Sequence, residues 1–170
     1  MKTLILCYSR TNKTRYVSEI LTELFNKDAQ LLHIQETKPF QRYGILGYLK
    51  TGMQAVFNIL PELKTPQTLT DCENIIICSP VWAFKPALPI KQFCLQNYEY
   101  ITSKKIGIIL TADSQTAAKI ATTYFDELFK DSQILFALNF VKLTNDKNKI
   151  KTKILPILET LKKYFINTDV

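Results

Sequence analysis

The sequence predicts an α/β fold, a three-layer α-β-α sandwich in which helices cover both faces of a parallel sheet. Three observations support this prediction. The 170 residues are enough for about one domain, and their composition, 46% hydrophobic and 22% charged, is close to the globular average. Short apolar runs also alternate with amphipathic stretches, as strands and helices do when right-handed crossovers join parallel neighbours. We therefore expect residues 1–170 to form a single domain.

Five apolar runs are the predicted strands. They are Thr3–Tyr8, Leu31–Ile34, Glu73–Cys78, Lys105–Thr111 and Gln133–Val141. Such short continuous runs suit strands that are covered on both faces. Two of the four cysteines lie inside them, and we expect the cysteines to be small core residues in a reducing compartment rather than disulfides.

Amphipathic helices are predicted between and after the strands. The apolar stripe of the first helix consists of Val17, Ile20, Leu21, Leu24 and Phe25. This spacing predicts that Thr14, Ser18 and Glu19 face outward. Later stripes predict helices over Ala117–Leu128 and Ile150–Phe165, and we expect Pro156 to kink the last helix or to mark its start.

The stretch Glu36–Cys72 is the least regular part of the chain, because it holds three of the four glycines and several prolines. One helix is predicted there, near Tyr48–Ile59. An ordinary crossover with a long entry loop is one interpretation, although loops of this length are often functional.

Missing residue types argue against several chemistries. His33 is the only histidine and no Cys-x-x-Cys pair occurs, which argues against a zinc site. The glycines do not form Gly-x-Gly-x-x-Gly, and no Gly-x-Ser-x-Gly motif occurs. The apolar runs are shorter than the roughly 18 residues that span a bilayer, and no signal peptide is recognisable. We expect a cytoplasmic protein without a membrane span.

The chain is basic, with a net charge of +7. Seven lysines lie between Val141 and Val170, where most alternate with apolar positions and so predict a solvated helix face. No nucleic-acid recognition motif accompanies them, and we expect no nucleic-acid partner. The charge leaves an acidic protein partner open.

Polar side chains crowd the loop after the first predicted strand. Its sequence Ser9-Arg10-Thr11-Asn12-Lys13-Thr14 places three hydroxyls, one amide and two cations at the start of a helix. Ligands of open parallel sheets bind outside the carboxyl ends of the strands, and helix N-termini attract anions. Because a single residue would suffice to cap the helix, we expect an anion site that fits a phosphate.

Two aromatic residues follow the third predicted strand. Trp82, the only tryptophan, and Phe84 lie between Pro80 and Pro86. Aromatic rings on a loop restricted by prolines are well placed to cover a flat ligand, while packing of Trp82 beneath the loop is the alternative. The loop after the fourth strand, Thr111-Ala112-Asp113-Ser114, is short and polar.

Together these motifs resemble the flavodoxin family, whose members bind flavin mononucleotide (FMN) on a five-stranded parallel sheet of order 2-1-3-4-5. Tyr8–Thr14 resembles the family's phosphate loop, Ser/Thr-x-Thr-Gly-x-Thr. Ser79-Pro80-Val81-Trp82 resembles its second flavin loop, and Lys104–Asp113 resembles the strand that leads into the third. The resemblance spans most of the chain and implies a flavodoxin-like fold.

The resemblance also implies a set of FMN-binding residues and no catalytic or metal-binding side chain. The phosphate would be held by Ser9, Arg10, Thr11, Asn12, Lys13 and Thr14. The ring would lie against Pro80, Val81, Trp82, Ala83 and Phe84, and its pyrimidine edge would face Thr111, Ala112, Asp113 and Ser114. Asn12 stands where the family commonly has glycine, and asparagine is the non-glycine residue that best tolerates the same left-handed backbone.

An FMN-dependent redox protein is the function that the resemblance implies, with the cofactor supplying the chemistry and the protein tuning its potential. Such a protein is either an electron carrier with a partner protein or an enzyme that reduces a quinone-like acceptor with NAD(P)H. A cofactor-free binding module on the same fold, with an acidic protein partner, is the alternative.

Overall fold

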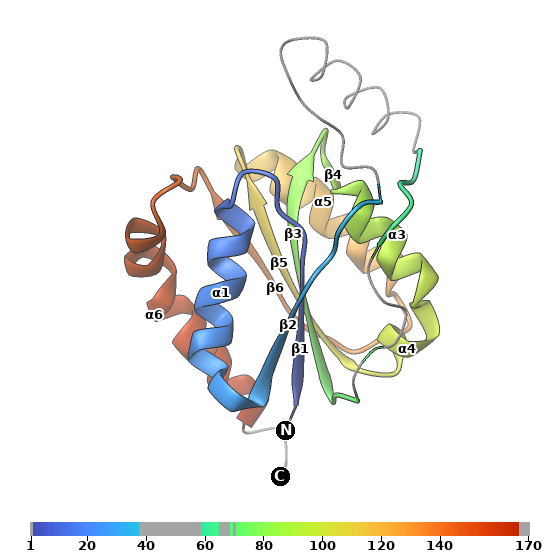
Figure 1. The fold of residues 1–170 in the computed structure, drawn as a ribbon, viewed down its shortest axis with the longest axis horizontal. Coiled ribbons are helices and arrows are strands. Elements are labelled where there is room, and N and C mark those ends of the chain that lie inside the picture. The colour runs from blue at the N-terminus through green and yellow to red at the C-terminus, as the bar shows by residue number, and fades with distance from the viewer. Residues whose placement is uncertain (1, 38–58, 65–68, 70, 167–170) are drawn as a thin grey trace.

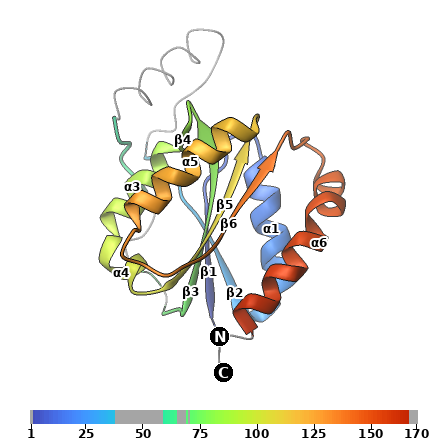
Figure 2. The same cartoon turned by 180° about the vertical axis from the view of Figure 1, so that it is seen from behind.

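Helices cover both faces of a central sheet (Figures 1 and 2). The structure is a computed structural model that describes residues 2–37, 59–64, 69 and 71–166. One face carries α1 (Lys13–Phe25) and α6 (Lys147–Ile166). The other face carries α3 (Leu88–Gln96), α4 (Tyr98–Thr102) and α5 (Gln115–Leu128). The predicted three-layer α/β architecture is confirmed.

The main strands have the expected order. The sheet runs β2-β1-β3-β5-β6 and all of these neighbours are parallel. The bounds are Thr3–Cys7 for β1, Ala29–His33 for β2, Asn74–Trp82 for β3, Lys105–Ala112 for β5 and Ile134–Val141 for β6. The short β4 pairs only with β3 and lies outside this order. When the five parallel strands alone are numbered along the chain, their order is 2-1-3-4-5. Parallel strands end on the same side, which we call the carboxyl edge (at the top in Figure 1), and the opposite side is the amino edge.

The third strand is longer than the sequence predicts. Instead of ending at Cys78, β3 continues to Trp82 and turns back into the antiparallel β4 (Lys85–Pro86). The two residues of the turn, Ala83 and Phe84, have φ angles of 46° and 64°. Two-residue hairpins require such left-handed angles and usually meet them with Asn-Gly, so the turn carries no recognisable sequence signal.

Alternate residues of the central strands fill two cores. Ile75 and Ile77 of β3 belong to the core under α3 and α5, and Ile76 and Cys78 belong to the core under α1 and α6. This alternation follows from the two-residue period of a strand. All four cysteines are buried, which confirms their expected place in the core.

The expectation that Thr14 and Ser18 face outward is wrong, because both are buried. The Thr14 hydroxyl lies 2.7 Å from the Thr111 hydroxyl, and the Ser18 hydroxyl donates to the Arg15 carbonyl at 2.8 Å. Short hydroxyl side chains can be buried on a helix when a hydrogen bond of this kind satisfies them.

Pro156 lies inside α6 and does not mark its start, because the helix already begins at Lys147. The proline removes one backbone hydrogen bond from the helix. The helix predicted near Tyr48–Ile59 falls almost wholly outside the described residues. No helix in the described part of the chain is long and apolar enough to cross a bilayer.

Candidate functional site

Three segments that follow strands meet at the carboxyl edge. They are loop 1 (residues 8–12) between β1 and α1, the hairpin (residues 81–86), and loop 3 (residues 113 and 114) between β5 and α5. The Arg10 guanidinium of loop 1 lies 4.5 Å from the Trp82 ring centroid in the hairpin. Lys13, the first residue of α1, reaches loop 3, where its Nζ lies 3.8 Å from the Asp113 carboxylate. The structure therefore brings the three motifs together.

Loop 1 enters α1 through a left-handed residue. Asn12 has φ 63° and ψ −13°, and its side chain makes no capping hydrogen bond. Its carbonyl accepts the first helical bond, from Tyr16 N at 2.8 Å. The Asn12 side chain therefore leaves the first N–H groups of α1 available, and these carry the positive end of the helix dipole toward the carboxyl edge.

Loop 1 also holds two buried polar atoms without a hydrogen-bond partner, Ser9 Oγ and Arg10 Nη1. Within the described residues the only other such side-chain atoms are Asn74 Oδ1 and Ser132 Oγ, near the amino edge. An unsatisfied buried polar group costs about 1–3 kcal/mol. A ligand acceptor beside either atom would satisfy it.

Arg10 reaches across to the hairpin and to the residues that follow β2. Its Nε donates to the Tyr8 hydroxyl at 2.6 Å, and its Nη2 donates to Glu36 Oε1 at 3.0 Å. The Tyr8 hydroxyl donates to the same carboxylate oxygen at 2.8 Å. Trp82 completes the group, since its ring meets the Tyr8 ring edge-on with centroids 5.5 Å apart. We call these four residues the Arg10 cluster.

The ion pair of the Arg10 cluster is largely buried. The side chains of Arg10 and Glu36 are 17% and 6% exposed, so that water screens their ion pair only weakly. Burial also raises the pKa of Tyr8 well above its ordinary value, although the nearby guanidinium opposes this. The Tyr8 hydroxyl therefore stays protonated and donates to Glu36 across the physiological pH range.

Glu36 is the site residue that the sequence analysis missed. Backbone bonds hold its segment in place, from Thr37 N to the Glu62 carbonyl at 2.9 Å and from Lys64 N to the Gln35 carbonyl at 2.8 Å. No motif marks a single carboxylate. Its position three residues after β2, at the same edge as the predicted loops, is the signal that could have found it.

The hairpin presents its two aromatic residues differently. Trp82 is partly buried and packs against the core under α3 and α5, while Phe84 is 51% exposed. Ser79 Oγ accepts a hydrogen bond from Ala87 N at 3.1 Å and braces the base of the hairpin. Trp82 thus combines partial packing, which was the alternative interpretation, with a place beside loop 1.

The predicted residues of the third motif mostly have structural partners. Thr111 bonds to Thr14, Ala112 is buried and accepts from Lys142 N at 2.9 Å, and Ser114 Oγ accepts from Ala117 N at 3.2 Å as the cap of α5. Asp113 is 98% exposed. In this motif, Asp113 is the side chain that reaches furthest into solvent.

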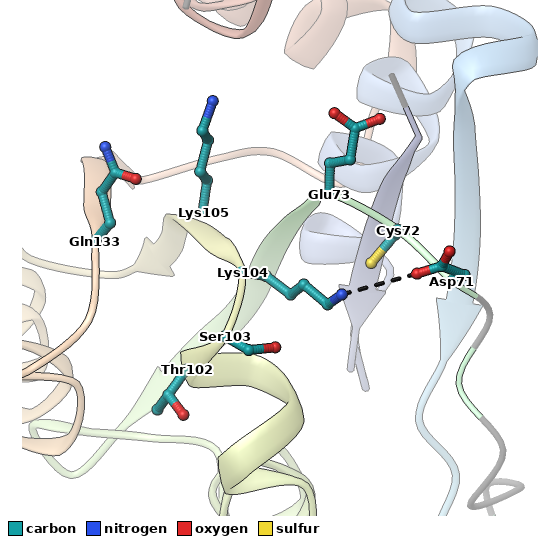
Figure 3. Close-up of a pocket in the computed structure, with 8 residues that line it drawn as sticks. All are labelled: Asp71, Cys72, Glu73, Thr102, Ser103, Lys104, Lys105 and Gln133. Atoms are coloured by element: carbon teal, nitrogen blue, oxygen red, sulfur yellow. Dashed lines mark ion pairs between the residues drawn. The ribbon is translucent and has the colours of Figure 1, made fainter.

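A cavity lies at the amino edge, on the opposite side of the sheet from the three motifs, and Figure 3 shows its lining residues. Its volume is about 490 Å³, and its walls come from the starts of β3, β5 and β6 and from the end of α4. Lys104 points across it toward Asp71, at 3.8 Å, and lies 4.9 Å from the Tyr100 ring centroid.

Comparison with known proteins identifies the fold. No protein-family model matches the chain, and no curated protein matches it. A flavoprotein from Lactobacillus acidophilus NCFM, solved in complex with FMN, is 24% identical with a TM-score of 0.68 over 81% of this chain and 92% of that one. A putative flavoprotein from Bacteroides uniformis is 17% identical with a TM-score of 0.69, over 91% of this chain and 97% of that one.

A flavodoxin from Fusobacterium nucleatum, solved with bound flavin mononucleotide, extends the likeness to more of the chain. It is 14% identical with a TM-score of 0.54, over 96% of this chain and 99% of that one. These likenesses, together with the strand order, show that the chain has a flavodoxin-like fold.

Proposed function

We propose that this chain binds FMN at its carboxyl edge and works as a redox protein. The observation that carries the proposal is the meeting of loop 1, the hairpin and loop 3 around a buried Ser9 hydroxyl that lacks a partner. The structural likeness to flavoproteins that hold FMN supports it. Bound FMN would accept and return a hydride or single electrons.

Loop 1 would hold the phosphate. Ser9, Thr11, Asn12 and Lys13 supply hydroxyl, amide and ammonium donors, and the start of α1 adds its N–H groups. Thr14 would contribute through its backbone, because its hydroxyl is paired with Thr111. The unpartnered Ser9 hydroxyl fits a phosphate oxygen, since it would gain there the hydrogen bond that it lacks.

The hairpin would hold the ring. Trp82 offers a large flat surface that the core and the turn keep in place, and Phe84 adds an exposed aromatic side chain beside it. Asp113 of loop 3 lies at the same edge of the sheet, with its charge partly balanced by Lys13. These residues would orient the ring and leave the chemistry to the cofactor.

FMN titration of the purified protein, followed by flavin fluorescence, tests the proposal. We expect binding at micromolar FMN or tighter. Ser9→Ala removes a buried hydroxyl that has no partner in the protein, so it should weaken FMN binding about tenfold without lowering the free energy of unfolding. Ser132→Ala is the matched control, because its hydroxyl is also buried and unpartnered but lies near the amino edge. Absence of binding at micromolar FMN would reject the proposal.

The electron donor and acceptor require a second assay. NAD(P)H oxidation in the presence of a quinone, measured on the FMN-loaded protein, would assign a reductase. Absence of turnover with either nicotinamide, together with reduction by a donor protein, would assign a carrier. With a net charge of +7 the chain suits an acidic partner, and its four unpaired cysteines suit a reducing compartment such as the cytoplasm.

A further inference from the structure

Arg10 lies in the loop assigned to the phosphate, but its guanidinium is held against the hairpin. We propose that Arg10 recognises the ring of the bound ligand rather than its phosphate, and that Glu36 and Tyr8 position it. This inference rests on the proposed function. It concerns which part of the ligand each cation of loop 1 contacts.

The contacts of the guanidinium fix its place. Nε is bonded to Tyr8 at 2.6 Å and Nη2 to Glu36 at 3.0 Å. The guanidinium carbon lies 4.5 Å from the centroid of the Trp82 ring and 5.9 Å from that of Tyr8. The other cation at this end of α1, Lys13, points instead to Asp113. The two cations are therefore directed to different parts of the site.

One donor of the guanidinium remains unused. Nη1 is buried and has no hydrogen-bond partner, although a guanidinium nitrogen normally finds one. The pyrimidine part of a flavin ring presents carbonyl oxygens and ring nitrogens as acceptors. A ring stacked beside Trp82 would bring these acceptors to the buried Nη1.

Glu36 and Tyr8 determine how Arg10 acts on such a ring. Glu36 prevents the guanidinium from swinging back toward the phosphate, because its carboxylate is buried and holds two donors, one from each neighbour. It also offsets part of the positive charge. Whatever charge is left favours the negatively charged, reduced form of the ring, so Arg10 should raise the reduction potential.

Comparison of FMN with riboflavin, which has the same ring and no phosphate, tests the inference. Arg10→Met should weaken binding of both flavins by the same factor, about ten- to a hundredfold for a charged hydrogen bond. It should also make the potential of the bound flavin more negative. Lys13→Met should weaken FMN binding more than riboflavin binding. Arg15→Met should change neither, because Arg15 is an exposed cation paired with Glu19 on α1.

The outcomes separate the two proposals. If the unaltered protein binds neither flavin, the proposed function fails. If it binds both and Arg10→Met weakens FMN binding alone, only the assignment of Arg10 to the ring is overturned. Arg10→Met leaves the Glu36 carboxylate buried without its cation, which can destabilise the fold. The double variant Arg10→Met/Glu36→Met removes both charges and avoids this destabilisation. The double variant should show the same equal loss for both flavins.

Discussion

A cation lies over an aromatic ring and beside a carboxylate at both edges of the sheet, but the two groups differ in burial. At the carboxyl edge the Arg10–Glu36 pair is 3.0 Å long with a carboxylate that is 6% exposed. At the amino edge the Lys104–Asp71 pair is 3.8 Å long with a carboxylate that is 98% exposed (Figure 3). The first pair is held by an additional hydroxyl bond, while water surrounds the Asp71 side of the second.

The difference shows that cavity size alone does not identify a site. The amino-edge cavity has a volume of about 490 Å³, yet its best-placed ion pair is screened by solvent. In the Arg10 cluster at the carboxyl edge the charges are desolvated, and buried donors of loop 1 lack partners. Arrangements of this kind cost folding free energy, and the ligand proposed above would give them a physical reason to exist.

The largest difference between the two groups should appear in stability. Glu36→Leu leaves the Arg10 charge buried without its counter-ion and should lower the free energy of unfolding by about 3–5 kcal/mol. Asp71→Leu should cause no resolvable change, because an exposed ion pair contributes little. Urea unfolding of both variants measures the effect, and equal losses would mean that the two edges are equally solvated.

Ligand binding should separate the two edges next. Trp82→Ala should weaken FMN binding about ten- to a hundredfold, since stacking on an aromatic side chain contributes about 1–3 kcal/mol per base-like ring. Tyr100→Ala removes the corresponding ring at the amino edge and should leave FMN affinity unchanged. Fluorescence titration of the two folded variants provides the measurement. A loss with Tyr100→Ala would place the ligand at the wrong edge.

The sheet, its order and its layers are predictable from the sequence because they depend on repeated signals. The run Ile75–Cys78 fills both cores by alternation, and each apolar helix stripe repeats the information. An error at one position does not change such a pattern. The burial of Thr14 and Ser18 is mispredicted, but both residues lie on α1, and the prediction of this helix is correct.

Single contacts between distant segments are not predictable in this way. Glu36 meets Arg10 across 26 residues, and only the pairing of its segment with residues 62–64 brings it there. The Ala83–Phe84 turn lacks the glycine that marks such turns, so the pairing of Trp82 with Lys85 must hold it. Tertiary packing determines both the Glu36–Arg10 contact and the Ala83–Phe84 turn, so local sequence propensities do not predict either of them.

A smaller effect should follow from backbone strain. In the described part of the chain five non-glycine residues have positive φ, and of these Asn12, Ala83, Phe84 and Lys142 lie at the carboxyl edge. A left-handed alanine destabilises the folded protein by roughly 1–2 kcal/mol, and replacing it with glycine removes this strain. Glycine also increases the entropy of the unfolded chain, which lowers the free energy of unfolding by about 0.5–1 kcal/mol. Ala83→Gly should therefore raise the free energy of unfolding by roughly 0.5–1 kcal/mol.

A matched alanine shows whether this gain comes from strain. Ala137 is exposed and lies in the ordinary strand backbone of β6, so Ala137→Gly should lower the free energy of unfolding by about 0.5–1 kcal/mol. Opposite signs in thermal or urea unfolding would locate the strain in the hairpin. A loss with both variants would show that Ala83 is not strained.

The smallest expected effect is a shift in the pKa of His33, which shows whether water is excluded from the end of β2 as well as from the Arg10 cluster. His33 ends β2 beside Cys7, and burial, assisted by the positive charge of Arg15, lowers its pKa below the ordinary 6.5. The folded protein then binds this proton less readily than the unfolded chain. The stability that neutral His33 contributes is therefore fully present above pH 6.5, and it is lost as the pH falls through the folded-state pKa of His33.

NMR titration of this single histidine measures the folded pKa directly. A midpoint below 6.5 is expected, and Arg15→Met should raise it, because removing a nearby cation favours the protonated imidazole. A midpoint at or above 6.5 would mean that water reaches the end of β2. The desolvated region would then be confined to the Arg10 cluster, and the contrast between the two edges would rest on its four side chains alone.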